Sequence, residues 1–263
     1  MVRKKQDPGT DSPDVTEARR RLRAVADPAQ VPAAQRFFRT GPGQYGEGDM
    51  FIGVKVPKIR ALVRELDGLV LGDIAALLAS AVHEERMLAL LLLVRRFERC
   101  KAHAGRLAIH DLYLGNTVWV NSWDLVDATA PTLVGAFLEA GKRDVLYRLA
   151  RSKSLWERRI AMVATLRLIR AGDIGDALGI AEILLGDRED LIHKAVGWML
   201  REVGQRDREA LERFLERHCR EMPRTMLRYA IEKFPEPRRR RWLNGLVGKP
   251  ALTGDARRDN IRR

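Results

Sequence analysis

A tryptophan and an aspartate stand four residues apart near the middle of the chain, at Trp123 and Asp127. If this stretch is helical, the two side chains project from the same face, because residues at i and i+4 are neighbours on a helix. An indole ring beside a carboxylate on one rigid face can bind a cationic, electron-poor group. The alternative is a core tryptophan with an aspartate that caps the helix expected from Pro131 onward.

A second candidate set lies in the segment 189–203. Lys194, Trp198 and Arg201 are spaced as i, i+4 and i+7, off the apolar stripe of the same predicted helix. An aromatic ring between two cations is common on nucleic-acid-binding surfaces, where the ring stacks and the cations contact phosphates. The alternative is that Trp198 packs against the next helix.

The segment 155–170 also combines an aromatic residue with arginines. We expect Trp156, Arg159, Arg167 and Arg170 to lie within one broad face of a helix. Each arginine alone could belong to an ordinary solvated face. Basic residues at matching positions in three successive helices favour a surface that binds a polyanion.

The overall charge supports the same partner. The chain of 263 residues has 48 lysines and arginines against 35 acidic residues, a net charge of +13. Such a surplus attracts polyanions, of which nucleic acid is the commonest.

The cysteine content and the hydropathy of the chain indicate its cellular compartment and whether a cofactor is expected. The two cysteines, Cys100 and Cys219, form no disulfide framework, which is typical of a reducing cytosol. No metal-binding motif is complete, so we expect neither a metal nor another cofactor. No signal peptide is recognised, and the longest apolar run, residues 87–94, is too short to cross a bilayer. We therefore expect a cytoplasmic, nucleoid-associated protein without a membrane partner.

Helical periodicity dominates the chain, and no alternating strand pattern interrupts it. Gly, Asp and Pro at the breaks separate the predicted helices, which span residues 15–38 with a break at 27–28, 57–66, 73–80, 84–98, 106–114, 122–128, 131–140, 144–151, 155–170, 174–185, 189–203, 207–219, 223–234 and 237–246. The sequence predicts an all-α fold.

A loose repeat is visible among these helices. Arg86, Arg159 and Lys194 each precede an apolar stripe, at separations of 73 and 35 residues. A unit of about 36 residues fits if the Trp123 helix takes the missing step. Two helices per unit predict a HEAT- or armadillo-like right-handed superhelix of antiparallel helix pairs with a basic concave face.

The domain boundaries follow from composition. We predict a disordered polar tail over 1–14, one repeat domain over 15–247 and a basic mobile tail over 248–263. The loop 41–49 contains a literal GxGxxG pattern, but a helix precedes it and no helix opens directly after it, so we do not interpret it as a dinucleotide fingerprint. We expect instead a flexible loop that can approach a ligand.

Three motifs in this order resemble the DNA alkylation repair family of AlkD-like DNA glycosylases. They are SWDLVDA at 122–128 followed by Pro131 and Thr132, LWERR at 155–159, and KAVGWMLRE at 194–202. The resemblance covers residues 36 to 234, approximately, and implies a HEAT-like superhelix that removes cationic N3- and N7-alkylated purines from duplex DNA without deep base flipping.

The resemblance also implies residue roles. Asp127 matches the family's catalytic aspartate, and Trp123 and Trp198 match two aromatics that contact the deoxyribose of the lesion. Arg159 matches an arginine on the neighbouring phosphate. DNA-backbone contacts are expected from basic residues, namely Arg201, Arg167 and Lys194. Some members carry a second tryptophan where Ser122 stands in this chain.

The chemistry fits these residues. An alkylated cationic purine is already a good leaving group, so one carboxylate suffices to stabilise the positive sugar and orient water. Neither Lys153 nor Lys194 makes a clear nucleophilic amine for a lyase, so we expect a monofunctional, monomeric glycosylase. Two alternatives remain: a non-catalytic solenoid that binds DNA or RNA structure, which would not need both tryptophans with Asp127 and Arg159, and a protein-interaction solenoid with an apolar or acidic groove.

Overall fold

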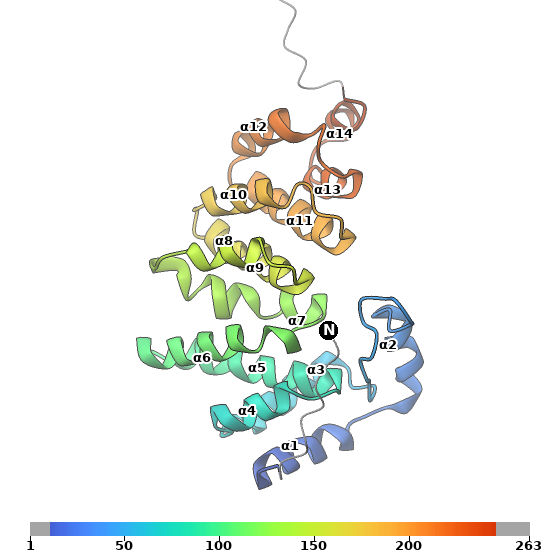
Figure 1. Cartoon of the computed structure of the whole chain (residues 1–263), viewed down its shortest axis with the longest axis vertical. Helices are drawn as coiled ribbons and strands as arrows, with labels where there is room; N and C mark the ends of the chain where they lie inside the picture. The colour runs from blue at the N-terminus through green and yellow to red at the C-terminus, as the bar shows by residue number, and fades with distance from the viewer. Residues whose placement is uncertain (1–10, 246–263) are drawn as a thin grey trace, which may run out of the picture.

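The computed structural model describes residues 11–245, and these form a stack of helices joined by short loops (Figure 1). Within this range the extended backbone amounts to one isolated bridge between Met50 and Val82. The all-α, HEAT-like fold predicted from the sequence is confirmed.

The α-helices follow the predicted segments closely. They are α1 (Pro13–Ala24), α2 (Val31–Phe37), α3 (Val56–Glu65), α4 (Leu71–Leu78), α5 (His83–Arg99), α6 (His103–Gly115), α7 (Trp123–Asp127), α8 (Asp144–Ala150), α9 (Leu155–Arg170), α10 (Gly175–Ile183), α11 (Asp190–Arg206), α12 (Arg208–His218), α13 (Arg224–Ala230) and α14 (Glu236–Leu243). Shorter helical turns are η1 (Pro28–Gln30), η2 (Thr117–Trp119), η3 (Pro131–Gly135) and η4 (Leu138–Ala140).

Two rows of helices produce the repeat. In the inner row α5, α7, α9, α11 and α13 each pack against the next, and α4, α6, α8, α10 and α12 cover them from the outer side. The central helix α9 is buried almost all round, since every residue from Arg159 to Ile169 except Arg167 is buried. Stacking is what gives each helix pair a core, because one pair alone cannot bury its apolar face.

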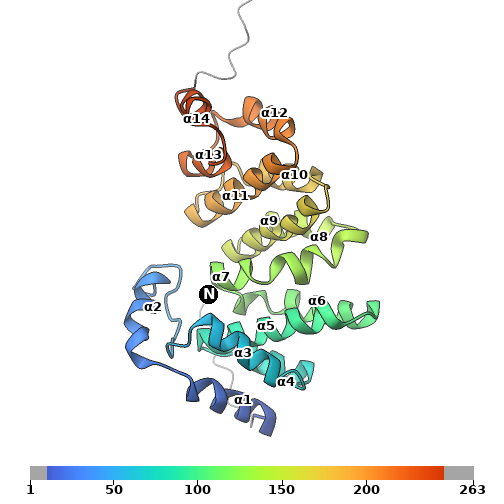
Figure 2. The ribbon, with the colours of Figure 1, turned by 180° about the vertical axis from the view of Figure 1, so that it is seen from behind.

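The N-terminal arm, which consists of α2 and the segment 38–55 after it, lies beside this stack. Helix α2 and the loop after it lie apart from the two rows, on the side where α7 ends, in both views (Figures 1 and 2). Glu85 of α5 holds α1 through Arg19 and Arg23 at 2.9 and 3.0 Å. Glu84 accepts backbone N–H groups from the returning strand-like segment, those of Ile52, Gly53 and Val54.

Besides shifts of a few residues at several helix ends, such as α13, which ends at Ala230 rather than at 234, the structure differs from the prediction in two ways. The helix predicted at 131–140 divides into a π-helical turn, η3, and a separate 3₁₀ turn, η4. The first of these turns packs closely on α9, because a Cβ on Gly135 would lie 2.2 Å from the backbone oxygen of Ala164. Helix α1 begins at Pro13, capped by Ser12, so residues 13 and 14 of the predicted tail are helical. Residues 1–10 of that tail, and 248–263 of the other, lie outside the described residues.

Between residues 11 and 245, no helix combines the length and the apolar character that crossing a bilayer requires.

Candidate active site

A cavity of about 620 Å³ lies between the N-terminal arm and the inner row of helices. Four chain segments besides α11 contribute to it: the arm, α7, α9 and α13. Its lining residues are Phe37, Arg39, Tyr45, Trp123, Asp127, Arg159, Glu189, Asp190, Leu191, Lys194, Trp198, Arg201 and Tyr229. The family resemblance assigns roles to seven residues, and all of these except Arg167 line this cavity.

Helix α7 carries Trp123 and Asp127 into the cavity. It spans five residues, so the i and i+4 positions form its two ends, as the sequence pattern predicted. Leu125 and Val126 are fully buried and anchor the opposite face. So short a helix has little stability of its own, and its orientation comes from these anchors and from its neighbours.

Trp123 is held among aromatic rings of the arm. Its ring meets Phe37 edge-on at 5.6 Å and stacks on Phe38 at 5.8 Å, measured between ring centroids. Ser122, the residue before it, is buried and does not line the cavity. A bulkier side chain at position 122 would therefore have to displace core packing before it could reach a ligand.

Asp127 and Arg159 form a bidentate ion pair. Arg159 donates from Nε to Oδ1 at 2.9 Å and from Nη2 to Oδ2 at 2.8 Å, and its Nη1 donates to the backbone oxygen of Leu191. Two parallel bonds fix the plane of the carboxylate as well as its position. The arginine is thus first of all the group that orients Asp127.

Burial sets the electrostatics of this carboxylate. Removal from water raises the pKa of Asp127 above its ordinary value, and the Arg159 guanidinium opposes that rise without cancelling it. The neighbouring Asp124 carboxylate adds to the rise. A carboxylate in a poorly solvated position interacts more strongly with a nearby positive charge than one in water.

Helix α11 presents the predicted polar stripe to the cavity. Lys194 pairs with Asp190 at 2.7 Å, and Trp198 donates from Nε1 to Glu202 at 3.2 Å. Arg201 contacts Glu232. The apolar stripe of the same helix is buried as expected, which leaves Trp198 half-buried at the cavity wall.

Arg167 is not part of this group. It is exposed, pairs with Glu139 at 2.8 Å, and lines a separate hollow with Arg106 and Arg170. Arg159, Arg167 and Arg170 do lie with Trp156 within one broad face of α9, but Arg167 and Arg170 line a different hollow from Arg159. Eight residues separate Arg159 from Arg167, which places them about 12 Å apart along the helix and turned by about 80°.

Arg86 also differs from its expected place. The repeat pattern aligned it with Arg159 and Lys194 as a surface cation, but its side chain is fully buried. It binds Asp49 at 2.7 Å, and Asp49 lies in the loop of the arm. Each of the three basic residues thus has its own acidic partner, since Arg159 pairs with Asp127 and Lys194 with Asp190, but Lys194 is partly exposed.

Residues of the arm and of α13 also line the cavity, although their sequence pattern did not indicate it. Phe37, Arg39 and Tyr45 reach the cavity from α2 and its loop, and Tyr229 from α13. The loop 41–49 was expected to approach a ligand, and Tyr45 is the side chain that lines the cavity. Phe37 could have been noticed as an apolar residue beside a second phenylalanine, but nothing in its spacing places it opposite Trp123.

Among residues 11–245 no group of three potential metal ligands is gathered in one place.

Residues 18–234 match a family described as DNA alkylation repair enzyme. The chain belongs to this family. A similar solved structure is described as a predicted DNA alkylation repair enzyme from Enterococcus faecalis. It is 17% identical, with a TM-score of 0.62, and the alignment covers 80% of this chain and 97% of the other. Curated proteins give no match. The matched range contains every residue that lines the cavity.

Proposed function

We propose that the protein is an AlkD-like, monofunctional glycosylase that hydrolyses the N-glycosidic bond of cationic N3- and N7-alkylated purines in duplex DNA. The observation that supports this most strongly is the meeting of Trp123, Asp127, Arg159 and Trp198 in one cavity. Membership of a DNA alkylation repair family makes DNA the partner.

The chemistry follows from the charge that the reaction creates. An alkylated purine that is already positive leaves as a neutral base, so its departure needs no protonation. Positive charge then grows on the deoxyribose, and a half-buried carboxylate such as Asp127 stabilises it electrostatically. The same carboxylate can orient the water that attacks the sugar.

The rings of Trp123 and Trp198 line the part of the cavity where the deoxyribose of the lesion would bind. Their rings can hold the sugar and attract its developing charge, with a cation–π contribution on the order of 1–2 kcal/mol once water is excluded. Trp123 comes from α7 and Trp198 from α11, so the sugar would be held between separate helices. This arrangement supports capture of the lesion without deep base flipping, as the family resemblance implies.

Arg159 has two roles in this proposal. It holds Asp127, and an arginine has five N–H groups, of which three are used by Asp127 and Leu191. The other two can contact the phosphate beside the lesion. Lys194 and Arg201 contact further phosphates. In this structure both are paired with carboxylates, so DNA has to displace Asp190 and Glu232.

We also propose that the protein acts as a monomer in the cytoplasm, associated with the nucleoid.

The alternative of a non-catalytic binder of DNA or RNA structure needs the cations but has no use for a half-buried, oriented carboxylate between two tryptophans. Product analysis separates the two. Incubation with duplex DNA containing 7-methylguanine should give free base and an intact strand with an abasic site, and borohydride should trap no enzyme on the DNA. Tight, salt-dependent binding with no base released would support the non-catalytic binder, and trapping would contradict the monofunctional assignment.

A further inference from the structure

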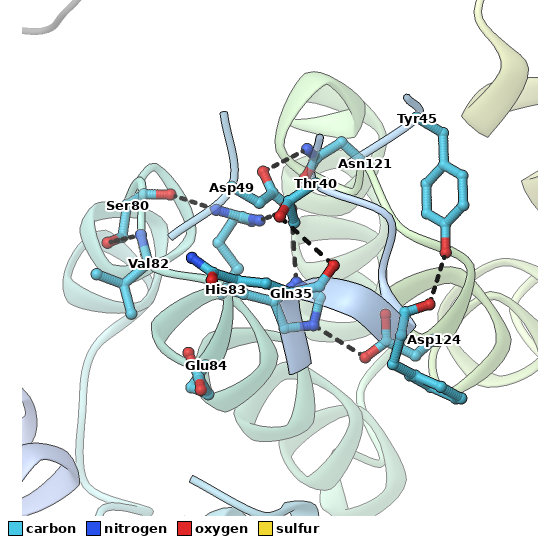
Figure 3. A network of polar contacts seen from close by, with 12 residues as sticks. Gln35, Thr40, Tyr45, Asp49, Ser80, Val82, His83, Glu84, Asn121 and Asp124 are labelled. Atoms are coloured by element: carbon cyan, nitrogen blue, oxygen red, sulfur yellow. Dashed lines mark hydrogen bonds and ion pairs between the residues drawn. The ribbon is translucent and has the colours of Figure 1, made fainter. Parts of the chain in front are cut away.

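A largely buried polar cluster joins α7 to the start of α5 and to the loop of the arm (Figure 3). Its centre is His83, the first residue of α5, and its other members are Asp49, Arg86, Asn121 and Asp124. None of these five lines the cavity that holds Trp123 and Asp127. The proposed reaction does not use any of them directly.

The imidazole of His83 forms a hydrogen bond with one carboxylate and a longer, ionic contact with a second, and the two carboxylates come from separate segments. Its Nε2 lies 2.9 Å from Asp124 Oδ2, and its Nδ1 lies 3.6 Å from Asp49 Oδ2. Asp49 belongs to the loop of the arm and Asp124 to α7. The rings of Phe38 and Phe51 lie against the imidazole, with centroid distances of 4.8 and 4.7 Å. The ring is therefore confined in both position and tilt.

The carboxylate of Asp49 is itself fixed. Its Oδ2 accepts from Arg86 Nη2 at 2.7 Å, and its Oδ1 accepts from Asn121 Nδ2 at 2.9 Å. Arg86 in turn donates to the backbone oxygen of Ser80 at 2.8 Å. Asn121 stands two residues before α7, so the cluster grips the entry to that helix as well as Asp124.

Asp124 lies between the two residues that would do the chemistry. It follows Trp123 directly and precedes Asp127 by three residues, within a helix of five. A rotation of α7 about its axis would move all three side chains together, because they share one helical turn. A contact that fixes Asp124 therefore also restricts the movement of the Trp123 ring and the Asp127 carboxylate.

We propose that His83, held between Asp49 and Asp124, is a positioning residue that sets the orientation of α7 and so of Trp123 and Asp127. The effect on catalysis rests on the proposed function, whereas the effect on the orientation of α7 does not.

The contact of His83 with the two carboxylates depends on pH. Burial and the cation of Arg86 lower the pKa of His83, but its contacts with Asp124 and Asp49 outweigh them, and the pKa is raised above its ordinary value. Glu84, on the same helix, is the further charged group beside the ring, and it is occupied with the N–H groups of residues 52–54. A raised histidine pKa means that this contact with both carboxylates is complete at acidic pH and is lost as pH rises through that pKa.

The first test follows α7 itself, without DNA. The indole N–H resonance of Trp123, assigned with Trp123→Phe, should shift with pH at the midpoint at which the His83 ring titrates. Asp124→Asn should move both midpoints to lower pH, because it removes one of the carboxylates that favour the charged ring. An indole resonance that stays constant through the His83 titration overturns the proposal, whatever the protein does to DNA.

The second test follows base release in single turnover, from about pH 5 to about pH 9, a range that spans histidine titration. The wild type should lose rate above the His83 pKa. His83→Gln keeps an N–H donor for Asp124 without titrating, so it should retain most of the rate and show no such loss. His83→Ala should slow release by about 10- to 100-fold, as small misplacements of reacting groups do, with DNA affinity kept within about twofold.

Matched controls separate positioning from stability. His103→Gln alters an exposed histidine on α6 and should leave the pH profile unchanged. Thermal unfolding shows whether each variant is folded at the assay temperature. If His83→Gln retains the alkaline loss of rate, the positioning role is contradicted. If no variant and no wild type releases base while the Trp123 resonance still follows His83, the proposed function fails and the positioning of α7 stands.

Discussion

Replacing Asp127 and Arg159 singly and together measures how far the two side chains act as one unit. Two unit charges about 4 Å apart attract by about 4 kcal/mol at an effective dielectric constant of about 20. Desolvation of both charges offsets part of this. The Arg159 side chain is 6% exposed and that of Asp127 is 20% exposed. We therefore expect a coupling of about 2 kcal/mol, within the range of about 0.5–3 kcal/mol measured for contacting pairs.

The assay is urea unfolding at neutral pH of the wild type, Asp127→Asn, Arg159→Gln and the double variant. Arg159→Gln should be the more destabilising single change, because it leaves a poorly solvated carboxylate without its bidentate partner. The double variant should lose less stability than the sum of the two single variants. A coupling below about 0.5 kcal/mol would refute the claim that Arg159 fixes Asp127.

Three further predictions concern pH, packing and charge. Base release should fall as pH drops through the pKa of Asp127, which burial raises above its ordinary value, and the acid limb of a single-turnover profile checks this. Gly197→Ala should destabilise the fold by about 1–3 kcal/mol in urea, because its Cβ would lie 2.5 Å from the Met226 backbone oxygen, whereas Gly72→Ala meets nothing within 4 Å and should not destabilise. Arg39→Gly removes a side chain from a left-handed position, φ 50°, and a cation from the cavity. Stability should therefore not fall, while the slope of log K against log salt for DNA binding should decrease by about one.

The repeat architecture was predictable because burial imposes a helical period on the sequence. Residues 155–170 match α9 at both ends, and the apolar stripe of α11 is the one that the sequence indicated. The spacing of residues 131–140 did not reveal that they divide into two turns, nor that η3 approaches α9 so closely at Gly135. The spacing of residues within one segment does not show how that segment packs against a helix later in the chain.

The same distinction applies to the site. Trp123 and Asp127 were found together because their spacing alone puts them on one helical face. Lys194, Trp198 and Arg201 followed from the face of α11 that the core leaves free. The ring of Phe37 and the ion pair of Asp127 depend on chain segments that only the fold brings together. Sequence spacing therefore located the residues, but their partners required the structure.

The most direct test of the central claim is single-turnover release of 7-methylguanine from duplex DNA by the wild type and by Asp127→Asn, with binding of both to the same DNA measured in parallel. We expect release by the wild type, loss of release in the variant, and DNA affinities within about twofold, because the change removes transition-state stabilisation rather than ground-state binding. Release at an unchanged rate by Asp127→Asn would contradict the assignment of this carboxylate and, with it, the mechanism proposed for the site.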